Sequence, residues 1–134
     1  MTALEQHIRA ENAKRSAWVA EDPDNRCAFL TVEDASHWAK YGVHTVEQYE
    51  LFQARAELWD VYKDVHGIRP RWMGIDEMSL AQVQAELESL YAEARAVREA
   101  EERAVREAEE ADREHARRVE CALTSHPLTQ KLFA

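Results

Sequence analysis

The sequence predicts an all-α protein: a small bundle of about four helices whose last helix is long and charged. Only three Gly and three Pro interrupt the 134 residues, whereas Ala, Glu, Arg and Leu, which favour helices, are abundant. Capping motifs mark several helix starts, and apolar residues recur at helical spacing. These observations predict helices at about 3–19, 32–41, 46–66 and 80–124.

Short motifs at both ends set these helix boundaries. A Ser or Thr followed three residues later by Gln or Asp resembles a capping box, and it occurs as Thr31 with Asp34, Thr45 with Gln48, and Ser79 with Gln82. Gly42 and Gly67 stand where a left-handed residue commonly ends a helix. Between the first two helices, "EDPDNRCAFL" predicts a turn followed by an extended stretch.

The helix at 46–66 is the predicted centre of the fold because its apolar residues form two seams. One seam holds Tyr49, Phe52, Ala56 and Trp59, and the other holds Leu51, Leu58, Tyr62 and Val65. A helix with two apolar seams packs between neighbours. The remaining sector is a polar, mostly acidic ridge of Glu50, Gln53, Glu57, Asp60 and Asp64. That ridge is interpreted as a solvated face, with docking of a basic partner as the alternative.

The last predicted helix has two parts of different character. Its first part carries a firm apolar stripe that is expected to close the core: Leu80, Val83, Leu87, Leu90 and Tyr91. Beyond Glu93 the stripe thins to Ala and Val, and "AVREAEER" at 96–103 recurs as "AVREAEEA" at 104–111. The predicted organisation is therefore a helical core over 1–92, a charged extension over 93–124 and a tail over 125–134.

The charged extension has several expected fates. Its eight-residue period does not keep one face inward as the heptads of a coiled coil do. It could project, pack against the first helix, whose Leu4, Ile8 and Trp18 need cover, or pair with a second copy as a homodimer. The tail is expected to break the helix near Pro127 and to present a short apolar hook of Leu128, Leu132 and Phe133.

The basic stretch "YKDVHGIRPRWM" at 62–73 stands out in a chain with a formal net charge of -9. Gly67 ends the central helix and Pro70 prevents its continuation. As a structural connector, the stretch would hold Arg69 and Arg71 near the negative end of that helix. Its acidic neighbours there would be Asp64, Asp76 or Glu77, and Trp72 and Met73 would return to the core.

The alternative interpretation gives this stretch a binding role, because two Arg side chains offer planar donors to a carboxylate or phosphate. The candidate partner-binding residues are Lys63, Arg69, Arg71 and Trp72 from the basic stretch, with Glu50, Glu57, Asp60 and Asp64 from the acidic ridge.

The run Tyr62, Lys63, Gly67, Arg69, Pro70, Arg71, followed by "MSLAQVQAELESL", resembles a group of small, mostly uncharacterised proteins of tailed bacteriophages. The resemblance covers about residues 45–91 and includes the upstream "YGVHTVEQYE". His66 replaces the Tyr or Asn of those proteins, and the helix after Glu93 lies outside the pattern. The resemblance implies a phage setting and carries no catalytic residue.

The residues give no enzyme signature. No GxSxG motif, phosphate-binding Gly loop or Cys with a nearby base is present, and the six His do not pair at a metal-binding spacing with a third ligand. We therefore expect no enzyme activity, no metal and no cofactor. Cys27 and Cys121 are interpreted as reduced, small apolar fillers in a cytosolic protein.

The distribution of charge, and the lack of a readable signal peptide or membrane span, limit the classes of partner and the location that we expect. The acidic charge is spread along the chain, whereas a nucleic-acid mimic needs a dense surface of one sign, so mimicry is unfavoured. No basic stripe is present, so nucleic acid is also an unfavoured partner. No signal peptide or membrane span is readable, which predicts a cytoplasmic protein, in the host cytoplasm if phage-encoded. The leading hypothesis is a phage-type accessory protein that binds a host enzyme or defence complex stoichiometrically, as an anti-CRISPR protein does. The alternatives are an oligomerising assembly protein that uses the long helix, or a nucleic-acid-directed factor that uses the Arg-Pro-Arg segment.

Overall fold

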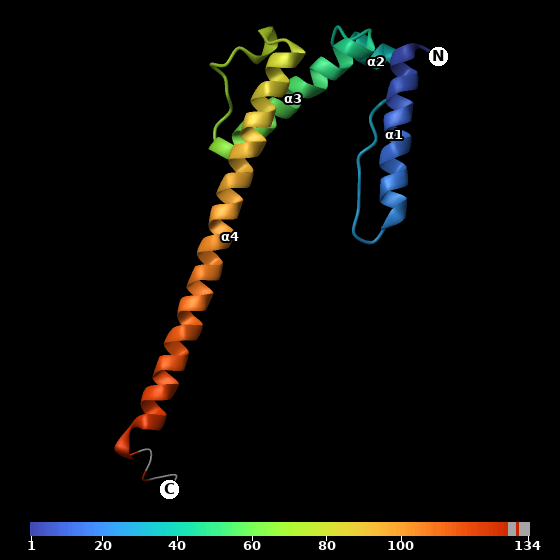
Figure 1. Ribbon diagram of the computed structural model, residues 1–134. Coiled ribbons are helices and arrows are strands. Elements are labelled where there is room, and N and C mark those ends of the chain that lie inside the picture. The colour runs from blue at the N-terminus through green and yellow to red at the C-terminus, as the bar shows by residue number, and fades with distance from the viewer. Residues whose placement is uncertain (129–130, 132–134) are drawn as a thin grey trace. The chain divides into compact units, whose positions relative to one another are not determined.

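The computed structural model describes residues 1–128 and 131, and over these residues the protein is helical with no strand (Figure 1). The α-helices are α1 (Ala3–Glu21), α2 (Ala35–Ala39), α3 (Val46–His66) and α4 (Leu80–Ser125), and a short 3-10 helix, η1 (Ile75–Glu77), precedes α4. The predicted all-α class, with a long last helix, is confirmed. The chain divides into two compact units, Met1–Leu90 and Tyr91–Ala134, where the sequence analysis placed the boundary after residue 92.

The capping motifs explain where the helices begin. Complete capping boxes start α3 at Thr45 and α4 at Ser79, as predicted, and an unpredicted third box joins Thr2 to Glu5 at the start of α1. The predicted helix at 32–41 is wrong in extent, because α2 begins only after Asp34. The Asp34 side chain caps α2 by itself, accepting the Ser36 N–H at 2.9 Å.

Two glycines in the left-handed region end α2 and α3, as predicted. After α2, the N–H of Gly42 reaches the Ala39 carbonyl and the N–H of Val43 reaches the Trp38 carbonyl, at 3.1 Å each. This pair of bonds is a Schellman motif, and it turns Val43 inward. After α3, the N–H of Gly67 reaches the Lys63 carbonyl at 2.7 Å.

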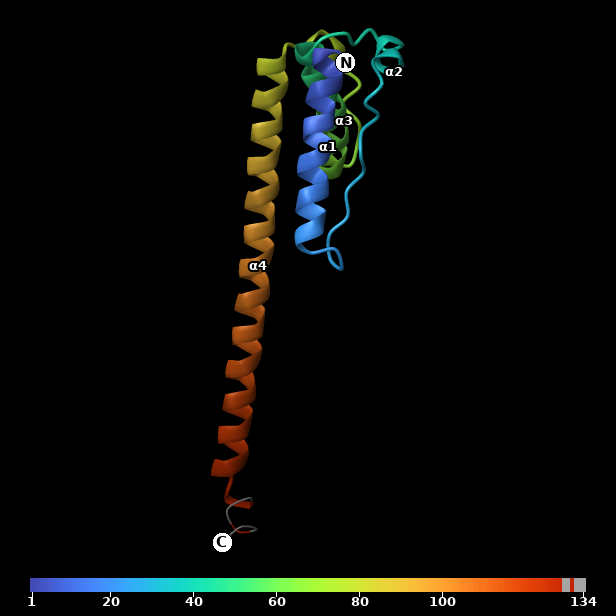
Figure 2. The ribbon, with the colours of Figure 1, turned by 90° about the vertical axis from the view of Figure 1, so that its right-hand side faces the viewer.

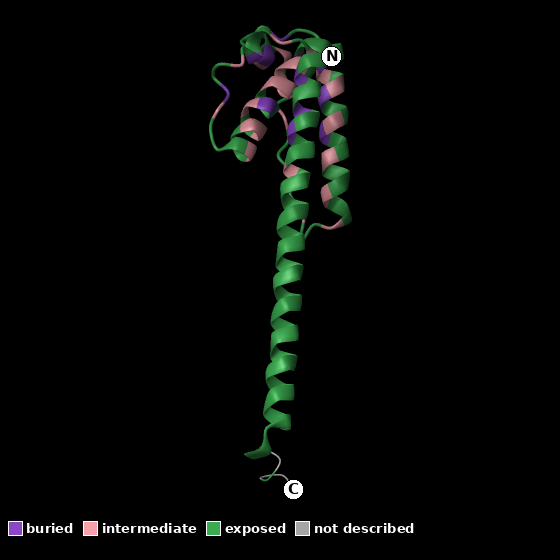
Figure 3. Cartoon of the chain, turned by 60° about the vertical axis from the view of Figure 1, so that its left-hand side comes forward, coloured by how far each residue is buried: buried purple, intermediate pink, exposed green. Residues whose placement is uncertain are grey.

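The core of the first unit consists of two apolar clusters, and both include residues of α3. Figure 3 marks the buried positions in purple. The first joins α1, α2 and α3 through Leu4, Ile8, Trp38, Val43 and Tyr49, with Phe52 packed against it. The second joins α3, η1 and the start of α4 through Leu58, Ile75, Val83, Leu87 and Leu90. The two predicted seams of α3 correspond to these clusters, except that Trp59 packs with the second cluster and Ala56 is exposed.

Glu5 ties the start of α2 to the start of α1. Its carboxylate accepts the Thr2 N–H at 3.0 Å and the Ala35 N–H at 3.1 Å. The Ala35 bond is the larger cause, and the Thr2 bond the next, of a pKa of Glu5 held below its ordinary value.

A group with a lowered folded pKa stabilises the fold above its unfolded pKa and loses that contribution as the pH falls. We therefore expect stability to decline as the pH falls below about 4.5, the ordinary value for Glu. Glu5→Gln, which keeps only one acceptor oxygen, should make this decline shallower. The measurement is the urea midpoint as a function of pH, with Glu99→Gln in the second unit as the matched control. An equal decline for the wild type and Glu5→Gln would contradict the assignment.

The segment between α1 and α2 turns at Asp22 and runs back beside α1 in an extended conformation (Figures 1 and 2). Its apolar side chains face solvent, and Phe29 is 95% exposed. Cys27 is exposed, and so is Cys121, so the prediction that both are apolar fillers is wrong. Trp18, which was expected to need cover, is half exposed and carries the guanidinium of Arg26 at 4.9 Å from its ring.

The second unit consists of the distal part of α4 and the described tail residues. All described residues from Arg95 onward are exposed (Figure 3). Tyr91 is 40% exposed, so its predicted place in the core stripe is wrong. Leu128 is exposed, and the other two residues of the predicted hook, Leu132 and Phe133, lie outside the described residues. Among the described helices, none has the length and apolar content needed to cross a bilayer.

Candidate protein-docking site

The chain reverses after Gly67, and residues 67–74, the connector, run back along α3 toward η1 (Figure 1). Two local bonds shape it: the N–H of Arg71 donates to the Arg69 carbonyl at 2.9 Å, and the N–H of Met73 to the Pro70 carbonyl at 3.2 Å. Pro70 is fully buried and anchors the connector. Of the residues around it, Arg69 and Met73 are half-buried, whereas Ile68, Arg71 and Trp72 are exposed.

Arg69 fastens the connector to α3. Its guanidinium lies 2.7 Å from Asp60 Oδ1 and 5.6 Å from the centre of the Trp59 ring. The expected partners of this Arg were Asp64, Asp76 or Glu77, and that expectation is wrong for Arg69. Because the connector runs antiparallel to α3, Arg69 is carried back past Asp64 to the earlier turn that bears Asp60. Arg69 therefore acts as a structural tie, as the connector interpretation predicts for this residue.

Arg71 and Trp72 are presented outward instead. Trp72 is 63% exposed, so the prediction that it returns to the core is wrong, whereas Met73 does pack against the second cluster. The ring of Trp72 is not loose, because it meets Tyr62 edge-on with the ring centres 5.7 Å apart. Ile68, at the start of the connector, is also 57% exposed. We call Lys63, Ile68, Arg71 and Trp72 the connector surface.

Two depressions flank Arg71. The larger, of about 850 Å³, is lined by apolar side chains that include Leu51, Phe52, Trp59 and Ile75, and by the charged side chains of Arg55, Asp60, Arg71, Asp76 and Glu77. The smaller, of about 420 Å³, is lined by Lys63, Ile68, Arg69 and Arg71. The smaller depression is therefore mainly cationic, and the larger one mixes apolar with charged side chains. A surface of this mixed kind, with Arg and aromatic residues, is typical of a protein–protein interface.

The acidic ridge of α3 is only partly available. Glu50, Glu57, Asp60 and Asp64 are exposed, as predicted, and Gln53 is half-buried. Asp60 is already paired with Arg69, and a third depression of about 600 Å³ lies along Glu50, Gln53 and Glu57. The structure thus brings Lys63 and Arg71 together with Arg69, which is paired with Asp60, whereas Trp72 lies against Tyr62. Glu50 and Glu57 line the third depression, and among the described residues no contact joins Asp64 to the group.

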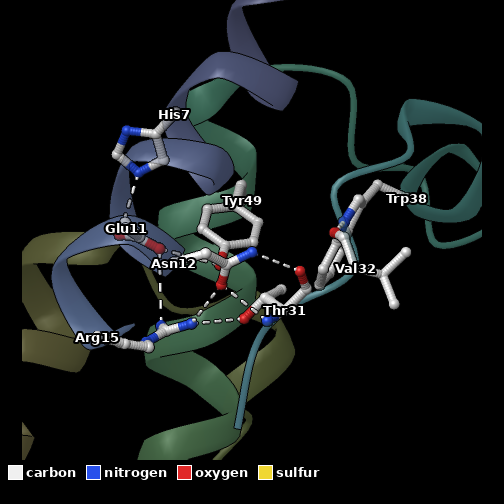
Figure 4. Close-up of polar contacts among 8 residues, drawn as sticks. All are labelled: His7, Glu11, Asn12, Arg15, Thr31, Val32, Trp38 and Tyr49. Atoms are coloured by element: carbon white, nitrogen blue, oxygen red, sulfur yellow. Dashed lines mark hydrogen bonds and ion pairs between the residues drawn. The ribbon is translucent and has the colours of Figure 1, made fainter. Parts of the chain in front are cut away.

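A polar network between α1, the extended segment and α3 was missed by the sequence analysis (Figure 4). Asn12, 7% exposed, donates to the Thr31 carbonyl at 2.8 Å and accepts the Thr31 N–H at 2.9 Å. The Asn12 amide thus makes the two backbone hydrogen bonds to Thr31 that a neighbouring β-strand would otherwise make. The available signal was the spacing of Leu4, Ile8 and Asn12, which puts an amide at the next position of a buried helical stripe.

The same network continues to α3. Arg15 donates to the Thr31 hydroxyl at 2.7 Å, and Tyr49 donates its hydroxyl hydrogen to Glu11 at 3.2 Å. Burial raises the pKa of Tyr49 above its ordinary value, and the nearby Glu11 carboxylate acts in the same direction. His7 lies on the other side of Glu11, at 3.2 Å. The bonds of Asn12, Arg15 and Tyr49 hold the extended segment against α1 and connect α1 to α3.

Two further observations bear on function. The part of the chain that the structure describes contains no group of three or more His, Cys, Asp or Glu side chains placed to hold a metal ion. Comparisons with protein-family models, curated proteins and solved structures found no match.

Proposed function

We propose that this protein is an accessory protein that acts by stoichiometric protein binding, without catalysing a reaction, and that the connector surface is its contact. The observation that carries the proposal is the presentation of Trp72, mostly exposed yet braced by Tyr62, beside Arg71. Trp and Arg dominate the energetic centres of protein interfaces. A large aromatic ring held outward in a fixed position loses little freedom on binding.

The biological setting of the proposal comes from the sequence resemblance to tailed-phage proteins over about residues 45–91. The connector surface lies within that range. In that setting the partner would be a host enzyme or a defence complex such as a CRISPR effector in the host cytoplasm. The acidic residues beside Arg71, namely Asp76 and Glu77 in the larger depression, favour a protein of mixed charge over a phosphate backbone.

The test compares two pairs of exposed residues in one binding assay. The wild type captures its partner from host lysate, and affinity for the purified partner is then measured. Arg71→Ala with Trp72→Ala should weaken binding at least about 100-fold, the scale of two interface hot spots, with an unchanged melting temperature. Phe29→Ala with Leu30→Ala is the matched control, because these side chains are also exposed but lie on the extended segment.

Three results would contradict the proposal. Failure to recover any partner near equal stoichiometry argues against stoichiometric binding. Loss of binding in the control pair, with the connector pair unaffected, moves the contact to the extended segment. Binding to duplex DNA that requires Lys63 and Arg71 and falls steeply with salt would favour the nucleic-acid alternative.

A further inference from the structure

The distal half of α4 carries an apolar face with no cover in the single chain. With 3.6 residues per turn, most of its apolar residues fall within about 60° of one line along the helix, and Ala96, Ala100, Ala111 and Cys121 lie outside that sector. The residues within it are Ala94, Val97, Ala104, Val105, Ala108, Ala116, Val119, Ala122 and Leu123. The larger members are well exposed: Val97 at 52%, Val105 at 57%, Val119 at 44% and Leu123 at 60%. Four charged or titratable residues interrupt this sector: Arg98, Glu101, Asp112 and His115.

The residue types of this face are nearly symmetric in sequence about Ala108. Ala94 and Ala122 are equally far from Ala108 along the chain, and so are Val97 and Val119. Two copies of the helix laid antiparallel with their Ala108 residues aligned would therefore place alanine on alanine and valine on valine. At the next symmetric positions, Glu101 would meet the partner's His115, and Ala104 the partner's Asp112. No charged residue of this face would then lie opposite the same residue of the second copy.

The charged residues beside this face are arranged so that, in an antiparallel pair, opposite charges face each other. One flank carries, in order, Arg95, Glu102, Arg106, Glu109, Arg113 and Glu120. Read from the other end, the same flank has the opposite sign at every position. In an antiparallel pair each flank meets the same flank of the other copy. Arg95 would thus face the partner's Glu120 and Glu102 the partner's Arg113, each pair formed twice by the two-fold axis, whereas Arg106 lies too far round the helix to reach the second copy.

A parallel arrangement in register lacks these features. It would place Glu101 against its own copy and Asp112 against its own copy, both within the apolar face. Like charges held together away from water are strongly unfavourable. From the exposed face and the self-complementary flank, we propose that α4 pairs antiparallel with a second copy of this chain, centred on Ala108. This proposal does not depend on the connector surface.

The side chains also indicate the strength of the association. The overlap from Ala94 to Ala122 spans roughly 40 Å of helix, and alanines at its centre allow the two helices to approach to about 8 Å. Small side chains bury little area, which puts the contact at the low end of specific interfaces. On the opposite flank, Glu107 would lie near its own copy, which further limits the affinity. A reversible dimer that responds to concentration and salt is expected.

Cysteine cross-linking tests the orientation directly in the full-length chain. The parent carries Cys27→Ser and Cys121→Ser, and single cysteines are introduced as Ala94→Cys, Ala108→Cys or Ala122→Cys. Antiparallel pairing predicts that the Ala108→Cys chain cross-links to itself. The other two chains should cross-link when mixed but not alone. Self-cross-linking of the Ala94→Cys chain, or no cross-linking in any sample, would overturn the proposal.

Charge reversal tests the register. Glu102→Arg should lower the dimer fraction measured by sedimentation equilibrium, and adding Arg113→Glu should restore it. Glu110→Arg makes the same change in charge on the far side of the helix and should leave the dimer fraction unchanged. Circular dichroism confirms that each variant keeps its helix. An equal loss in Glu102→Arg and Glu110→Arg, or no rescue by Arg113→Glu, would show that net charge alone is responsible and refute the register.

Discussion

Trp38→Ala is expected to lower the free energy of unfolding of the first unit by about 3–5 kcal/mol, the usual cost of deleting a buried large aromatic side chain. Trp38 is 5% exposed and its ring lies 5.0 Å from Tyr49 and 5.6 Å from Phe52, centre to centre. It also donates its indole N–H to the Val32 carbonyl at 2.7 Å. One side chain therefore connects α2, α3 and the extended segment, and its loss affects all three.

The measurement is a urea titration of the full-length chain followed by near-ultraviolet circular dichroism, which reports aromatic packing. Trp38→Phe is the matched control, because it keeps an aromatic ring but removes the donor to Val32. It should cost about 1–2 kcal/mol, the scale of one unsatisfied carbonyl and a small loss of volume. Equal effects of the two substitutions would show that the hydrogen bond, and not ring packing, dominates.

Since a small domain is stable by only about 5–15 kcal/mol, the Trp38→Ala variant should be close to unfolding at physiological temperature.

Asn12→Ala is the second large expected effect, a loss of about 2 kcal/mol. It removes the acceptor of the Thr31 N–H and the donor to the Thr31 carbonyl at once. It also removes an oxygen that lies 3.3 Å from Arg15. The extended segment would then be held to α1 by fewer bonds, and hydrogen exchange in residues 26–34 should accelerate more than in α3.

Asn25→Ala provides the control for Asn12→Ala. Asn25 is exposed and its amide contacts Asp22 within the same turn, so its loss should change stability by at most about 0.5 kcal/mol. If Asn12→Ala were as mild as Asn25→Ala, water would be replacing the bonds to Thr31. The extended segment would then be held mainly by Trp38.

The helices were predictable because their causes are local. Thr45 with Gln48, and Ser79 with Gln82, mark helix starts by bonds to backbone groups three residues away. Gly42 and Gly67 mark helix ends through their left-handed backbone. The two seams of α3 were readable because 3.6-residue spacing gathers them on the surface of a single helix.

The candidate site was predicted less well, because its contacts are not local. The basic stretch was correctly identified as a connector that follows a helix end, yet the partner of Arg69 was misassigned. The predicted partners were Asp64, Asp76 or Glu77, whereas the reversed path of the connector brings Arg69 to Asp60. Trp72 was expected to return to the core under the connector interpretation, and to contact a partner under the binding interpretation. Its ring is 63% exposed and lies against Tyr62, a contact that residue spacing alone does not predict.

The sequence by itself determined the helical class, the positions of α1, α3 and α4, the two apolar seams of α3 and the negative net charge. Each of these follows from hydrogen bonds, backbone preferences and apolar spacing within one helix or turn. Only the tertiary structure decided that Asn12 holds the extended segment, that Arg69 is tied to Asp60, and that Arg71 and Trp72 face outward. The physical reason is that a polar or aromatic side chain contacts whichever residue folding brings within about 3–6 Å. The path of the whole chain decides which residue that is.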